Sequence, residues 1–268
     1  MSTVIVIPAR FGSKRLPGKP LIPIAGKTLL QRVYEVALQV KVPDSPIEVM
    51  IATDDERIRQ HALDLGAKVV MTPTECPTGT DRTLACVQQL SVRPDIIINL
   101  QGDAPFTPPH FLSSLIQTMQ GHPSADLATP FVQLTWEELD RFRKSKLMTP
   151  FSGTTVAVDN NGYALWFSKL IFPSIRDEDQ YRERHPLSPI RKHIGVYGYR
   201  YHALEKFVAL PEGYYEKLEG LEQLRCLENG MRIKMIQVDY QGAKALSGID
   251  SPEDVIRAEA LLKESIIT

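Results

Sequence analysis

The N-terminal half of the chain alternates apolar runs with amphipathic stretches, and this alternation restricts the possible folds more than any other feature of the sequence. The apolar runs are typical of strands and cover residues 4–7, 49–52, 68–71 and 95–100. Between them, apolar residues recur at helical spacing over residues 29–40, 54–66 and 81–90. Asp54 is placed to cap the second of these helices. The series predicts an α/β fold, with a mostly parallel sheet and helices on both of its faces.

The second half of the chain has a different pattern, and we expect it to contain a smaller, partly antiparallel lobe. Its predicted strands are residues 156–158, 163–167, 196–199 and 233–238, and its predicted helix is 219–228. Ser251 and Asp254 form a capping box for a closing helix over residues 252–263. We therefore expect a single domain over residues 1–268, with lobes at 1–150 and 151–245 and a return to the main sheet at 246–268.

Charge and composition exclude several classes of protein. A formal net charge of −1 argues against a nucleic-acid binder with a wholly basic surface. No apolar run reaches the roughly 18 to 20 residues of a membrane span, and the N-terminus lacks the pattern of a signal peptide. Three cysteines without a CxxC pair do not indicate a disulfide framework. We expect a cytoplasmic protein with no nucleic-acid partner and no membrane insertion.

A loop rich in cations follows the first predicted strand. It covers residues 8–20, and its cations are Arg10, Lys14, Arg15 and Lys19. Ligands of parallel sheets gather at the carboxyl ends of strands, and glycines let backbone N–H groups approach an anion. Neither the GxGxxG nor the Walker spacing is present. The loop is suited to wrapping a polyphosphate, with a solvated basic loop as the alternative.

Two acids occupy comparable positions far apart in the sequence. Asp103 comes just after the predicted strand 95–100, and Asp250 just before the predicted closing helix. Two carboxylates in one loop cluster can share a Mg²⁺ with triphosphate oxygens. The alternatives are a turn at Asp103 and helix capping at Asp250.

Another polar segment offers groups that suit a base edge and a ribose. Hydroxyls, a close backbone approach and a guanidinium are provided by Thr78, Gly79, Thr80 and Arg82. The alternative is a purely structural role, in which Thr80 or Asp81 caps a helix.

Several ungapped motifs point to one family. They are IPAR (7–10), SKRLPGKPL (13–21), ATDD (52–55), TGTDR (78–82), NLQGD (99–103), GYALWFS (162–168), HIGVYGY (193–199), LEGLEQLR (218–225) and GIDSPED (248–254). In type and order they resemble the nucleotidyltransferases that activate acidic sugars, most closely the 3-deoxy-manno-octulosonate cytidylyltransferases, or CMP-Kdo synthetases. The resemblance covers nearly the whole chain.

The resemblance implies a nucleotide-diphospho-sugar transferase-like fold and a homodimer formed through the second lobe. It also implies a reaction that depends on Mg²⁺, in which CMP is transferred from CTP to the anomeric hydroxyl of an acidic 3-deoxy sugar. Pyrophosphate is released, and the product serves lipopolysaccharide or surface polysaccharide synthesis. Implied catalytic residues are Arg10, Arg15, Lys19 and Asp103, and implied metal ligands are Asp103 and Asp250. Implied nucleotide contacts are Pro8, Ala9, Arg10, Lys19, Thr78, Gly79, Thr80, Arg82 and Gln101. The implied sugar pocket is formed by Gln101, His193, Tyr197, Glu222 and Gln223, although a lone His or Tyr in a strand is more often a core residue.

The chain departs from the family pattern at two positions. Ala104 stands where the family usually has Glu, and Thr155 stands where it usually has Lys. Charge is lost at both places, so the acceptor can differ from the unmodified octulosonate. The alternatives are an amino-substituted octulosonate, a nonulosonate, or a catalytically weak paralogue that only binds nucleotide.

Overall fold

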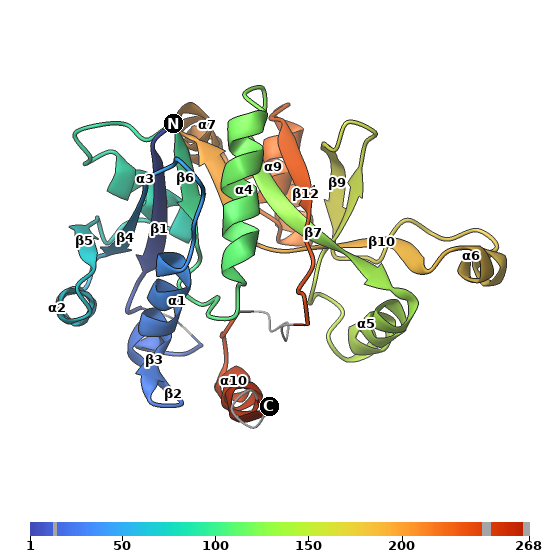
Figure 1. Cartoon of the computed structure of the whole chain (residues 1–268), viewed down its shortest axis with the longest axis horizontal. Helices are drawn as coiled ribbons and strands as arrows, with labels where there is room; N and C mark the ends of the chain where they lie inside the picture. Colours follow the sequence, from blue (N-terminus) through green and yellow to red (C-terminus); the bar gives the residue numbers. More distant parts are fainter. Residues whose placement is uncertain (13–14, 243–247, 265–268) are drawn as a thin grey trace. The chain divides into compact units, whose positions relative to one another are not determined.

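The computed structural model describes residues 1–12, 15–242 and 248–264, which form two compact units (Figure 1). The first unit is Met1–Gln117 with Tyr240–Thr268, and the second is Thr118–Asp239. The units thus divide after residues 117 and 239, whereas the sequence analysis placed its divisions at 150 and 245. Lys14, one of the cations of the predicted phosphate loop, lies outside the described residues.

The first unit contains a parallel sheet. Its strands, in spatial order, are β5 (Lys68–Met71), β4 (Ile47–Thr53), β1 (Thr3–Ala9) and β6 (Ile96–Asn99). All three pairings are parallel, and every residue of β1 and β6 is buried. Burial on both faces explains why these strands are continuous apolar runs without alternation.

Helices cover this sheet. Those that contact its strands are α1 (Leu29–Leu38), α2 (Glu56–Asp64) and α3 (Gly79–Val87). The 3₁₀ helix η1 (Lys19–Leu21) precedes a small hairpin of β2 (Pro23–Ile24) and β3 (Lys27–Thr28), and α10 (Pro252–Glu264) contacts β2. Helix α4 (Pro109–Gly121) begins in the first unit and extends past Gln117. The crossovers β1–α1–β4 and β5–α3–β6 run in opposite directions along the sheet, so right-handed connections place α1 and α3 on opposite faces (Figure 1). The predicted parallel sheet with helices on both faces is confirmed.

Two details of helix capping were tested. The prediction that Asp54 caps α2 is wrong: the N-cap is Asp55, whose Oδ1 accepts from the N–H groups of Arg57 and Ile58. Asp54 instead accepts a hydrogen bond from Arg82 at 2.7 Å. The predicted capping box at Ser251 is confirmed by reciprocal hydrogen bonds with Asp254.

The strand ends of the first unit approach one another too closely for larger residues. A Cβ on Gly102 would lie 2.6 Å from the carbonyl oxygen of Pro8, and one on Gly79 would lie 2.8 Å from Oε1 of Gln101. Glycine at position 102 therefore lets the loop after β6 lie against the backbone at the end of β1, whereas at position 79 the nearest atom is the movable end of the Gln101 side chain.

The second unit is built around β7 (Leu127–Thr135). Its other strands are β8 (Thr155–Val158), β9 (Ala164–Ser168), β10 (Leu187–His193), β11 (Tyr197–Arg200) and β12 (Ile233–Gln237). Strands β10 and β11 pair with β7 antiparallel, β12 pairs with it parallel, and β8 pairs antiparallel with β9 and β10. The predicted partly antiparallel lobe is confirmed, although β7 and β10 were not predicted.

The helices of the second unit are α5 (Trp136–Met148), α6 (Glu178–Arg184), α7 (Tyr201–Ala209), α8 (Tyr214–Glu219) and α9 (Gln223–Glu228). The prediction of one helix over 219–228 is wrong, because Gly220 adopts a left-handed conformation (φ 64°) and separates α8 from α9. Among the described residues, no helix is both long enough and apolar enough to cross a membrane.

His193, at the end of β10, is buried in the second unit. Its Nε2 lies 2.8 Å from Oγ1 of Thr129, and its ring packs edge-on against Phe167, with ring centres 5.0 Å apart. Burial, aided by the nearby charge of Lys169, lowers the pKa of His193 from 6.5 to about 3. The imidazole is therefore neutral in the folded protein at physiological pH.

We predict that His193 makes stability depend on pH below about 6.5. Between the unfolded and folded pKa values only the unfolded chain binds the proton, so the free energy of unfolding falls as pH falls, by about 1.4 kcal/mol per pH unit. Above the unfolded pKa the contribution is fully present. Urea denaturation at several pH values between 7.5 and 5 gives the free energy of unfolding, and its dependence on pH should be shallower for His193→Gln than for the native chain. The control His202→Gln, at a side chain that is 73% exposed, should keep the native slope; equal slopes for all three proteins would contradict the prediction.

Candidate functional site

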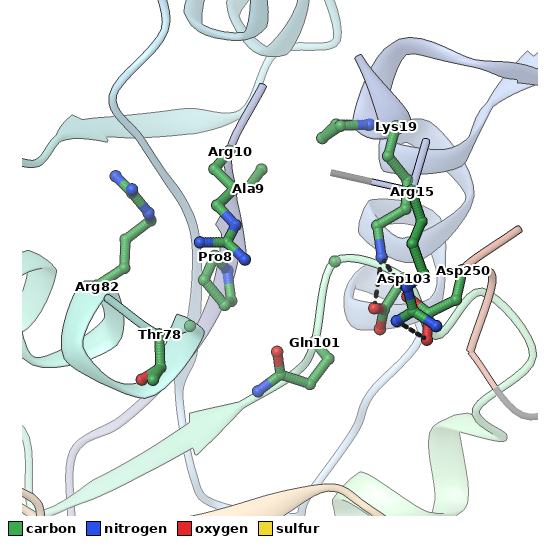
Figure 2. A pocket seen from close by; sticks show the side chains of 13 residues that line it. Pro8, Ala9, Arg10, Arg15, Lys19, Thr78, Arg82, Gln101, Asp103 and Asp250 are labelled. Carbon is green, nitrogen blue, oxygen red and sulfur yellow. Dashed lines mark hydrogen bonds and ion pairs between the residues drawn. The ribbon is translucent and has the colours of Figure 1, made fainter. Parts of the chain in front are cut away.

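A cavity of about 340 Å³ lies at the carboxyl end of the first unit's sheet (Figure 2). It is lined by Pro8, Ala9, Arg10, Arg15, Lys19, Pro20, Thr78, Gly79, Arg82, Gln101, Gly102, Asp103 and Asp250. The loops after β1 and β6, the start of α3 and the residues before α10 all contribute to it. Of the residues expected to contact nucleotide or metal or to act in catalysis, all except Thr80 line this cavity.

The loop after β1 holds its cations through backbone contacts. Gly18 has a left-handed φ of 68°, and its N–H donates to the carbonyl oxygen of Phe11 at 3.1 Å. A Cβ at Gly18 would lie 3.2 Å from the Phe11 ring, whose face also carries the guanidinium of Arg57 at 3.3 Å. The turn leads directly into η1, whose first residue is Lys19, so the backbone at Lys19 is held in place. The Lys19 side chain is only 16% exposed.

Asp103 and Asp250 are brought together by the chain's return to the first unit. The N–H of Ile249 donates to the carbonyl oxygen of Asp103 at 2.8 Å. The Nζ of Lys19 then contacts both carboxylates, at 2.7 Å from Asp103 and 3.0 Å from Asp250 (Figure 2). Both acids therefore point to one place, although Lys19 and Asp250 are 231 positions apart in the sequence.

Arg15 and Arg10 occupy different parts of the cavity. Arg15 pairs with Asp250 at 3.0 Å, while its own side chain is 70% exposed. Arg10 is exposed, and its guanidinium donates to the carbonyl oxygen of Pro77 at 3.4 Å. Arg10 thus extends from the end of β1 toward the segment that precedes α3, on the side of the cavity away from the acids (Figure 2).

At the start of α3, some of the residues predicted to contact nucleotide face the cavity, and Thr80 faces the core. Thr78 caps the helix by accepting from the N–H of Asp81, and Gly79 lies against Gln101. Thr80 is buried and accepts a hydrogen bond from Asn99 inside the core, so its hydroxyl does not face the cavity. Thr78, Gly79 and Gln101 are therefore the groups that this region presents to a ligand.

Arg82 lines the cavity, but its guanidinium is engaged elsewhere. It donates to Asp54 at 2.7 Å and to the hydroxyl of Thr72 at 2.6 Å, and its side chain is 2% exposed. The sequence analysis included Asp54 in a family motif without identifying it as the partner of Arg82. A buried guanidinium needs a carboxylate to offset its desolvation, and that requirement is the signal that points to such a partner.

Three of the residues expected in the sugar pocket form a connected group in the second unit. The hydroxyl of Tyr197 donates to Oε1 of Gln223 at 3.1 Å, and the rings of Tyr197 and His193 are 5.6 Å apart. Gln223 is 3% exposed, and among the described residues its Nε2 has no hydrogen-bond partner. A buried donor without an acceptor is costly, so this amide is suited to a ligand. Glu222 is half-buried beside it at the N-cap of α9, whereas Gln101 lines the cavity of the first unit.

The hydrogen bonds around Thr129 determine which nitrogen of His193 carries the proton. The Thr129 hydroxyl has a single hydrogen and lies 2.8 Å from the carbonyl oxygen of Val196, to which it donates. It therefore accepts from Nε2–H of His193, which leaves Nδ1 as an acceptor. Burial, together with Glu222, raises the pKa of Tyr197, so its phenol stays protonated.

Comparisons of the sequence with a family model and with individual proteins point to the same family. The cytidylyltransferase family model matches residues 4–233. The chain is 42% identical over 262 residues to 3-deoxy-manno-octulosonate cytidylyltransferase of Maricaulis maris (strain MCS10), covering 98% of this chain and 97% of that protein. It is 39% identical over 266 residues to 8-amino-3,8-dideoxy-manno-octulosonate cytidylyltransferase of Shewanella amazonensis (strain ATCC BAA-1098 / SB2B), covering 98% and 99%.

Comparison with solved structures leads to the same family. The structure of CMP:2-keto-3-deoxy-manno-octonic acid synthetase complexed with CTP superposes with a TM-score of 0.83 at 35% identity, covering 99% of this chain and all of that one. This match confirms the expected fold class, and together with the sequence relatives it confirms the resemblance drawn from the motifs. The chain belongs to the cytidylyltransferase family of nucleotidyltransferases.

Proposed function

We propose that this protein transfers CMP from CTP to the anomeric hydroxyl of 3-deoxy-manno-octulosonate or a close variant and releases pyrophosphate. The observation that carries the proposal is the cavity of the first unit, where cations of the loop after β1 meet two carboxylates from distant parts of the chain. The names of the relatives support the acceptor, since they specify the octulosonate and its 8-amino form.

The cavity suits a nucleoside triphosphate. Arg10, Arg15 and Lys19 supply three positive charges along one loop, and charge-assisted hydrogen bonds to phosphate oxygens are the strong ones. We assign the nucleoside to the opposite side, where Pro8, Ala9, Thr78, Gly79 and Gln101 offer backbone and side-chain groups. Arg82 acts there through Asp54 by fixing the residues that lead into α3.

The two acids fit a divalent ion. Asp103 and Asp250 already share one cation, so their oxygens face a common point, and carboxylate oxygen is the ligand that Mg²⁺ prefers. Among the described residues there is no group of three or more His, Cys, Asp or Glu arranged to hold a metal, so the remaining ligands would come from phosphate and water. A bound Mg²⁺ would supply charge stabilisation for phosphate oxygens.

The reaction is an in-line displacement. The anomeric oxygen forms a bond to the α-phosphorus of CTP while the bond from that phosphorus to the pyrophosphate oxygen breaks, and the hydroxyl proton leaves to solvent. Lys19, Arg15 and Arg10 stabilise the negative charge that develops on the departing pyrophosphate. Positioning and charge carry the catalysis, and no residue of this chain forms a covalent intermediate.

The second unit supplies the sugar contacts in this proposal. Nδ1 of His193 accepts from a sugar hydroxyl, and the unpaired Nε2 of Gln223 donates to a sugar oxygen. Tyr197 fixes the amide of Gln223 so that this nitrogen is the free end. Glu222 lies beside them at the N-cap of α9 and completes the contacts from this unit.

The identity of the acceptor depends on two substituted positions. Thr155, in place of the usual lysine, is buried and donates to the carbonyl oxygen of Leu170 at 2.6 Å. Ala104 stands in place of the usual glutamate, so position 104 contributes no charge of its own next to Asp103. We keep the 8-amino octulosonate as an alternative acceptor because relatives at 39% identity carry that name. Pyrophosphate release with CTP, UTP or ATP and a panel of sugar acids, nonulosonates included, tests the choice; no release with any acid would instead favour a binding-only paralogue.

We predict that Asp103→Asn and Asp250→Asn each reduce Mg²⁺-dependent CMP transfer by about 100-fold or more. Asparagine keeps the shape but removes the charge, and a metal site contributes several kcal/mol, with about 1.4 kcal/mol for each factor of ten. The matched control is Asp64→Asn, at an exposed acid of α2 that accepts from Gln60. Pyrophosphate release under saturating CTP measures the effect, and near-native rates in both site variants would refute the assignment.

For the sugar pocket, we predict that Gln223→Glu raises KM for the acid sugar by about tenfold or more while KM for CTP stays unchanged, because one charge-assisted donor is lost and an acid faces an acid. Glutamate keeps the oxygen that Tyr197 contacts. Gln237→Glu, at an exposed position of β12, is the control. A rise in both KM values, or in neither, would count against this role of Gln223.

We also propose that the protein acts as a homodimer in the cytoplasm, where CTP is available. Apolar side chains at the end of α5 and after β9 are exposed, at 83% for Leu147, 84% for Met148, 76% for Phe151 and 74% for Leu170. Lys146 holds them near one another by donating to the carbonyl oxygens of Pro150 and Lys169. Such a patch is typical of an interface. Sedimentation equilibrium should give twice the chain mass of 30.1 kDa, and a monomer at micromolar concentration would disprove the dimer.

A further inference from the structure

The acidic pair of the cavity is already paired with cations of the protein itself. Lys19 contacts Oδ2 of Asp103 and Oδ1 of Asp250, and Arg15 contacts Oδ2 of Asp250. Three of the four carboxylate oxygens therefore face a positive charge, as Figure 2 shows. These are the same oxygens that a divalent ion would need.

Lys19 is held in this position more firmly than an ordinary surface lysine. It lies in η1, next to the buried Pro20 and after the turn fixed by Gly18. Its side chain is 16% exposed and that of Asp103 is 28% exposed, so solvent screens the pair only partly. Arg15, at 70% exposure, is a weaker partner.

The charges of this cluster balance without any metal. Two carboxylates face one ammonium and one guanidinium, so a divalent ion that bound beside them would be repelled by both cations. An ion can use the carboxylates fully only when Lys19 leaves them. A triphosphate supplies the alternative anionic partner for Lys19 and Arg15, because these side chains line the same cavity.

We propose, on the basis of the proposed function, that Lys19 is the resident counter-ion of the metal site and closes it in the nucleotide-free protein. Metal and CTP then bind cooperatively, since the triphosphate draws Lys19 away from Asp103 and Asp250 and leaves them to the ion. By linkage, the ion raises the affinity for the triphosphate by the same factor.

Mn²⁺ binding to the nucleotide-free protein tests the proposal without any turnover. The loss of the free Mn²⁺ signal in electron paramagnetic resonance gives the dissociation constant directly. We expect Lys19→Met to bind Mn²⁺ about tenfold or more tightly than the native chain, because one of the two competing cations is gone. Arg15→Met should show a smaller gain, since Arg15 contacts a single oxygen and is exposed. Lys27→Met, which removes an exposed pair with Glu35, should bind like the native chain.

A second substitution locates the bound ion. Adding Asp103→Asn to Lys19→Met should abolish the gain, and circular dichroism melting checks that each variant is folded. Equal Mn²⁺ affinity in the native, Lys19→Met and Arg15→Met proteins would overturn the proposal, as would a gain that survives Asp103→Asn. These outcomes are separate from the catalytic assay: a protein that transfers no CMP still reports the competition, and an active protein without the competition refutes only this inference.

Discussion

The parallel pairing of β1 with β4 and β6 is the constraint on which the site depends. Parallel strands end at the same edge of a sheet, so the cationic loop after β1 and the acid after β6 emerge side by side. The contact of Gly102 with the Pro8 carbonyl then fixes how close these loops come. The positions of the cationic loop and of Asp103 follow from strand order, and the chain's later return to the first unit adds Asp250.

A second constraint is the balance between anchored and available polar groups. Arg82 and Lys19 both line the cavity, yet Arg82 is committed to Asp54 and Thr72 whereas Lys19 bridges two acids at the cavity itself. Thr80 and Thr78 differ in the same way, since one faces the core and the other caps a helix at the cavity. In each pair, one residue supports the site and the other presents a group to it.

The sequence predicted the first unit well because β1 and β6 are buried apolar runs and the helices between the strands are amphipathic. It predicted the second unit less well: β7 mixes buried and half-buried positions, and the break at Gly220 interrupts a leucine spacing that reads as one helix. The residues that line the cavity were recognisable from family motifs, but Thr80, which the same motifs place at the nucleotide, faces the core instead. Side-chain direction at the start of a helix, and the choice between Asp54 and Asp55 as the cap, depend on tertiary partners that are distant in sequence.

The path of the chain has a consequence for how the protein is assembled during its own synthesis on the ribosome. The polypeptide leaves the first unit after Gln117, forms the whole second unit, and returns at Tyr240 before it contributes Asp250. The first 117 residues contain the cationic loop and one acid but lack the second acid and the helix that follows it. A nascent chain therefore has its cationic loop long before its acidic pair is complete, so the lining of the cavity can be assembled only after Asp250 has been synthesised.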